Sequence, residues 1–105
     1  MNEEIAWDDL HDAILLDIDS SWDSGEITIR LRTGLSEARE AKIKGVGGRL
    51  IEWPRRHPWG PSIYVNTVRG PTPTSDGASS RLEIEMQSGD TIILEAKEFQ
   101  LIPAK

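Results

Sequence analysis

The densest group of side chains that could bind a ligand lies between residues 50 and 61, in the sequence LIEWPRRHPWGP. Tryptophan and arginine dominate protein-binding hot spots, and aromatic rings can also stack on bases or grip sugars. We therefore predict a binding site here. The alternative, which a small core with one Phe and one Tyr favours, is that both tryptophans plug the open end of the barrel as bulky filler while the arginines lie in water. The candidate residues are Trp53, Arg55, Arg56, His57 and Trp59.

A second group with chemical potential is His11 beside Asp12. A histidine next to a carboxylate can act as an acid–base pair, but catalysis requires further groups within reach. We favour a structural interpretation, in which one of the two side chains hydrogen-bonds a backbone group where the chain enters its first strand.

Metal and nucleotide motifs are missing from the sequence. Asp17, Asp19 and Asp23 are spaced like the start of a calcium loop, but Trp22 stands where an EF-hand requires Gly, and Thr28 where it requires Glu. Cysteine is absent, the two histidines lack the paired spacing of a metal site, and no phosphate loop or GxSxG motif occurs. We therefore expect no catalytic residues, no metal and no cofactor.

Charge is distributed unevenly along the 105 residues, whose net charge is −6. Residues 1–26 contain nine acidic and no basic residues, whereas residues 27–81 are net positive. An acidic protein repels nucleic acid and attracts a basic protein partner, although the same acids could serve solubility alone. No apolar run reaches the roughly 18–20 residues of a membrane helix, and no secretory signal is visible. We expect a cytoplasmic protein without membrane contact.

Alternating apolar residues predict half-buried strands over residues 13–19 and 26–32, joined by the turn-rich SSWDSG. Further strands are expected at 38–46, which ends in a bend at Gly47-Gly48, and at 62–68, with a brief extended stretch at 50–53. The side chains predicted to share the inner face of the first two strands are Ile14, Leu16, Ile18, Ile27, Ile29 and Leu31.

The clearest hairpin joins residues 81–87 and 91–96. A three-residue loop, 87–89, places Ile84 opposite Ile92 and Leu82 opposite Leu94, and so keeps the apolar face intact. The same loop puts Gly89 where a type I turn with a G1 bulge requires a positive φ. We predict this register rather than that of a two-residue turn.

Together these elements predict a single, mainly β domain over residues 1–105. Six or seven short antiparallel strands would form a small sheet curled into a barrel or sandwich. A short helical or irregular arm, 1–12, is expected to dock through Trp7 and Leu10, and residues 70–80 to form a flexible loop. Phe99 and Leu101 are expected to close the core.

Three strings give the chain a family resemblance: LHDA at 10–13, PWGPS at 58–62 and IEMQSGD at 84–90. They resemble small uncharacterised bacterial proteins with an LHDA opening, some of which are grouped with immunity proteins of polymorphic toxin systems. The resemblance implies a cytoplasmic, non-catalytic protein that masks a toxin domain. It covers under a third of the chain and transfers no functional residues.

The sequence thus predicts a non-catalytic protein-interaction module with a basic partner and no nucleic acid. The alternative is a barrel that binds a sugar or metabolite in a closed apolar cavity. Pairing of an exposed strand into a homo-oligomer is left open.

Overall fold

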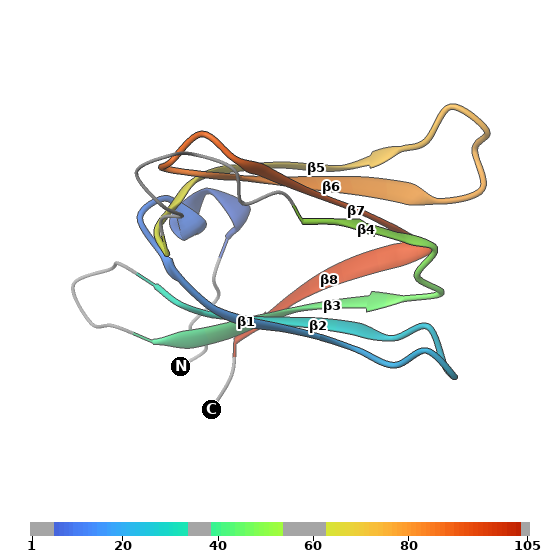
Figure 1. The fold of residues 1–105 in the computed structure, drawn as a ribbon, viewed down its shortest axis with the longest axis horizontal. Helices are drawn as coiled ribbons and strands as arrows, with labels where there is room; N and C mark the ends of the chain where they lie inside the picture. Colours follow the sequence, from blue (N-terminus) through green and yellow to red (C-terminus); the bar gives the residue numbers. More distant parts are fainter. Residues whose placement is uncertain (1–5, 34–38, 54–62, 104–105) are drawn as a thin grey trace.

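A computed structural model describes residues 6–33, 39–53 and 63–103 of the chain, which form two antiparallel four-stranded sheets (Figure 1). The first sheet has the order β1-β2-β3-β8, with β1 (Ile14–Ser20), β2 (Ile27–Arg32), β3 (Glu40–Val46) and β8 (Glu98–Pro103). The second has the order β4-β7-β6-β5, with β4 (Leu50–Glu52), β5 (Val65–Pro73), β6 (Ser80–Met86) and β7 (Thr91–Ala96). The predicted mainly β, antiparallel class is confirmed. The described strands form two sheets and not one closed barrel, and they number eight instead of six or seven.

The two sheets meet at a corner where two long strand pairs bend together (Figure 1). The chain passes from β3 to β4 through Gly47, and from β7 to β8 through Lys97. The Lys97 N–H donates to the Val46 carbonyl at 2.8 Å, so the pairing continues around the bend. Because the bend divides each of these long segments, the brief stretch at 50–53 and the C-terminal stretch become separate strands.

The core lies between the sheets and follows the predicted alternation. Ile27, Ile29 and Leu31 are buried, while the residues between them face outward. The register of β6 and β7 is the predicted one, with Ile84 opposite Ile92 and Leu82 opposite Leu94. Gly89 has a φ of 103°, as the three-residue loop requires. Phe99 and Leu101 pack against the core as expected.

The prediction for β1 is wrong at Leu16. The β1–β2 register shifts between Leu15, which pairs with Leu31, and Asp17, which pairs with Arg30. Leu16 is therefore the extra residue of a bulge, and its side chain is 40% exposed. Leu15 takes the inward position, and together with Ile18 it packs against the core. The inner face of β1 is thus Leu15 and Ile18, rather than a continuous set of even-numbered residues.

Two other elements refine the prediction. The N-terminal arm contains a 3-10 helix, η1 (Trp7–Leu10), and docks as expected: Leu10 is buried and Trp7 packs on the core. The loop expected at 70–80 is shorter, because β5 continues through Pro73 and β6 begins at Ser80. No helix within the described ranges has the length and apolar character needed to cross a membrane.

Alternating charges form a ladder across the outer face of the second sheet. Each arginine contacts two carboxylates, at N–O distances between 2.9 and 3.2 Å. In order, the seven residues of this charge ladder are Asp76, Arg49, Glu95, Arg81, Glu83, Arg69 and Glu85. Strand alternation explains the arrangement on β6, because Arg81, Glu83 and Glu85 face outward while Leu82 and Ile84 face the core.

The charge ladder predicts a loss of stability in acid. Hydrogen bonds from Arg81 and then Arg69 lower the pKa of Glu83 below its ordinary 4.5, and Arg49, Thr74 and the Ala78 N–H lower the pKa of Asp76 below 3.8. A carboxyl group whose pKa is lower in the folded state stabilises the fold above its ordinary pKa, and this contribution disappears as the pH falls through the folded-state value.

Thermal unfolding of the wild-type chain and Glu83→Gln between pH 7 and pH 2 tests this. The wild type should be the more stable at pH 7, and the difference should shrink below about pH 4.5, because Gln does not titrate. A difference that stays constant down to pH 2 would contradict the assignment.

Candidate functional site

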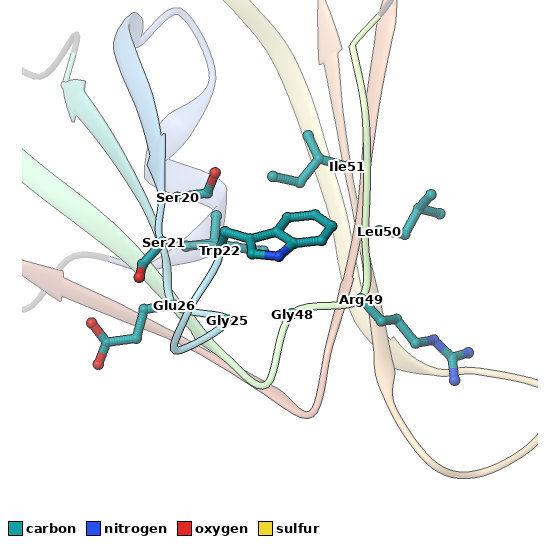
Figure 2. A pocket seen from close by; sticks show the side chains of 10 residues that line it. Ser20, Ser21, Trp22, Gly25, Glu26, Gly48, Arg49, Leu50 and Ile51 are labelled. Carbon is teal, nitrogen blue, oxygen red and sulfur yellow. The ribbon is translucent and has the colours of Figure 1, made fainter.

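An open groove of about 580 Å³ lies between the β1–β2 turn and β4 (Figure 2). We call it the β4 groove. One wall comes from the end of β1 and the following turn, and the other from the start of β4. Its lining residues are Ser20, Ser21, Trp22, Gly25, Glu26, Ile27, Gly48, Arg49, Leu50 and Ile51.

Apolar side chains are left open to solvent around this groove. Trp22 projects from the turn and is fully exposed, and Figure 2 shows its indole ring and the side chain of Ile51 pointing toward each other. Ile51 is 37% exposed, and Trp53 just beyond it is 63% exposed. Ile51 pairs with Leu94, a core residue, so its side chain lies on the inner face of the second sheet. The β4 groove is therefore a place where the apolar space between the sheets opens to water.

Two glycines hold the walls together at the floor of the groove. Gly25 closes the turn with a φ of 76°, and the Gly48 N–H donates to its carbonyl at 2.8 Å. A Cβ atom on Gly48 would lie 2.9 Å from the Gly25 oxygen and 2.7 Å from Cδ1 of Ile27. The turn can approach the chain before β4 this closely only because Gly48 has no side chain.

The rim of the β4 groove is acidic. Arg49 is already neutralised by Asp76 and Glu95, each at 2.9 Å, and Lys44 lies 3.8 Å from Glu26. Glu26 lines the groove and shares its charge with Lys44, while the exposed Asp23 and Glu52 follow lining residues of the two walls directly in sequence. The local field therefore attracts positive charge.

The predicted site overlaps the groove at one residue. Trp53 lies at the end of β4 and is largely exposed, so it does not plug the core. The remaining candidates, Arg55, Arg56, His57 and Trp59, lie outside the described residues.

Sequence reasoning missed Trp22 as a surface residue, although the signal was present. Its neighbours in SSWDSG are all polar turn formers, and a lone aromatic residue at the tip of a tight turn has no apolar face to share. Ile51 had no such signal, because its exposure depends on which strands flank β4.

His11 and Asp12 take the structural role that we favoured. His11 Nδ1 donates to the Asn66 carbonyl, which ties the arm to β5. Asp12 Oδ1 accepts from Gln87 Nε2 at 2.6 Å, and the Asp12 N–H donates to the Val65 carbonyl at 2.8 Å. Both side chains fasten the entry to β1 against the second sheet.

Asp12 adopts a φ of 68°, in the left-handed region where aspartate and asparagine are the best tolerated non-glycine residues. Asp12→Ala should lower the free energy of unfolding by about 1–2 kcal/mol, because it keeps the unfavourable φ and loses the hydrogen bond to Gln87. Asp12→Asn, which keeps an acceptor oxygen, should cost less than half as much. Urea denaturation measures both, and equal losses would contradict the explanation.

Within the described ranges, no group of three or more His, Cys, Asp or Glu side chains could hold a metal ion. Comparisons of the whole chain with family models, with curated proteins and with solved structures found no match.

Proposed function

We propose that this chain is a non-catalytic protein-binding module, a sandwich-like pair of sheets that holds a partner in the β4 groove. The observation that carries the proposal is the fully exposed Trp22 opposite Ile51, with the largely exposed Trp53 two residues after Ile51. Grouped aromatic and aliphatic side chains on a surface mark interaction sites, and tryptophan is the residue most enriched in binding hot spots.

The partner's contact surface is proposed to be basic. The acidic rim would speed its approach and orient it, while burial of the apolar side chains would supply most of the affinity. Nucleic acid does not fit, because the same carboxylates repel its phosphates.

One specific setting follows from the resemblance of the LHDA opening to immunity proteins. There the partner would be a bacterial toxin domain, masked in the cytoplasm. Co-expression of the chain with the product of the reading frame immediately upstream tests this setting. Protection of the host supports it, and toxicity that persists without a complex argues against it.

A small-molecule site is the second candidate, favoured by the volume of the groove. About 580 Å³ lies within the roughly 300–1,000 Å³ of typical ligand pockets. Thermal unfolding of the protein in the presence of each compound of a metabolite library, monitored by tryptophan fluorescence, distinguishes the two functions. A ligand-dependent rise in melting temperature supports the pocket, whereas no rise supports the interaction module.

Trp22→Ala should weaken capture of a stoichiometric partner from native lysate by about thirtyfold or more, which corresponds to loss of a hot spot of about 2 kcal/mol. Its melting temperature should stay unchanged, because Trp22 makes no contribution to the core. Capture by the wild type should also weaken as salt is raised, since the rim charges are screened.

Leu16→Ala is the matched control, because Leu16 is exposed and apolar but does not line the groove. Equal capture by the wild type and both variants would refute the proposed use of this groove.

A further inference from the structure

The free edge of β4 adds main-chain hydrogen bonding to the β4 groove. Among the strands of residues 6–33, 39–53 and 63–103, β4 pairs only with β7, and the groove opens beside it. An unpaired strand edge offers backbone donors and acceptors to another chain. The groups of β4 that point to this edge are fixed by the registers of β6, β7 and β4.

The hydrogen-bond pattern of β6 and β7 sets the direction of the Leu94 backbone groups. The Met86 N–H donates to the Asp90 carbonyl at 2.8 Å, and the strands continue from there in the register that sets Leu82 opposite Leu94. In an antiparallel ladder, hydrogen-bonded and non-hydrogen-bonded pairs alternate. Four residues further along, Leu82 and Leu94 are again a hydrogen-bonded pair, so the backbone groups of Leu94 point to β6.

The same alternation sets the direction of the Ile51 backbone groups on the other side of β7. Ile51 lies opposite Leu94, whose backbone groups are already used, so this pair is not hydrogen-bonded. In agreement, the neighbouring Glu95 carbonyl points to the β4 side, where it accepts from the Arg49 N–H at 2.8 Å. The N–H and C=O of Ile51 therefore point away from β7, and no backbone partner for them occurs among the described residues.

We propose that the partner adds an extended strand to the edge of β4, with alternating apolar and basic side chains. This inference rests on the proposed function and specifies its partner. The strand would pair with the N–H and C=O of Ile51 and set its apolar side chains against Ile51 and Trp53. Its alternate lysine or arginine side chains would lie on the opposite face of the sheet, beside Glu52. Such strand addition is an established mode of peptide recognition.

Charge favours this occupant over a second copy of the chain. A symmetric antiparallel pairing of two β4 edges would bring the Glu52 side chains of both copies close together on one face. Like charges across an interface oppose association, whereas the basic side chains of an added strand would neutralise Glu52.

The test is an NMR titration of the full chain with a ten-residue synthetic peptide of alternating valine and lysine. We expect binding with slowed exchange of the Ile51 amide proton, and at least tenfold weaker binding of the matched valine–glutamate peptide. Two further peptides carry N-methyl groups on all valines or on all lysines. Alternate N–H groups of a strand point to opposite edges. One methylated peptide should therefore bind as the parent does, and the other at least tenfold more weakly.

Each outcome decides the proposal. Equal binding of both methylated peptides, still dependent on Trp22, would refute strand addition and leave the groove as a binding site. Failure of the valine–lysine peptide to bind would refute the basic strand, while partner capture by the wild type but not by Trp22→Ala would still support the proposed function. Dimerisation in sedimentation that is lost on Ile51→Pro would show that a second copy occupies the edge, and would also refute the proposal.

Discussion

Replacing Leu94 by Ala should lower the free energy of unfolding by about 2–5 kcal/mol, the range for leucine truncation in a packed core. Leu94 is completely buried and lies between Leu82 on β6 and Ile51 on β4. Truncation removes apolar contacts on both sides and leaves a cavity between the sheets. Urea denaturation, monitored by tryptophan fluorescence, measures the change in the free energy of unfolding.

Leu16→Ala is the control, because it removes the same atoms from a bulge at the surface. It should cost less than about 1 kcal/mol, in line with surface substitutions. Losses of similar size for the two variants would show that Leu94 does not lie in a tightly packed core.

Gly70→Ala should also destabilise the chain strongly, by about 2–4 kcal/mol. Gly70 lies where the β5–β6 register shifts between Arg69 and Thr72, with a φ of 100°. A Cβ atom added there would lie 2.5 Å from the Arg81 carbonyl oxygen, which belongs to the neighbouring strand and cannot rotate aside. The methyl group must therefore push β5 and β6 apart, and thermal unfolding should show a lower midpoint.

Gly77→Ala separates the two causes of this loss. Gly77 also has a positive φ, of 71°, but a Cβ atom on it would meet nothing within 4 Å. It should cost only the conformational penalty, about 1–2 kcal/mol. If Gly77→Ala proves as harmful as Gly70→Ala, the close approach to Arg81 is not the cause.

The β6–β7 hairpin was predictable in detail because two independent local rules agree there. Alternation places Leu82 and Ile84 on one face, and the Gly89 turn permits only one register that preserves that face. Neither rule needs knowledge of the rest of the molecule. The strand at 26–32 was predictable from its regular alternation, which the burial pattern of β2 follows without a break.

The errors occur where a bulge breaks the local rule. An extra residue at Leu16 shifts the inward positions of β1, and nothing in the apolar run 13–19 marks this position. At Gly70-Pro71 the residue types indicate a loop, yet they form an irregularity within β5. A bulge depends on how the partner strand twists away, which is a property of the pair and not of one segment.

The proposed binding site was predictable only in part, for a related reason. Composition drew attention to Trp53, but the free edge at Ile51 follows from the sheet order β4-β7-β6-β5. That order joins segments more than forty residues apart. Periodicity can indicate that a strand exists, whereas its neighbours are set by the packing of the whole chain.

The charge ladder has a consequence for how other molecules approach. Its seven charged groups already satisfy one another across the outer face of the second sheet. A molecule that settled there would have to strip water from all of them without offering better contacts. The ladder thus discourages other sheets from stacking on this face in a crowded solution.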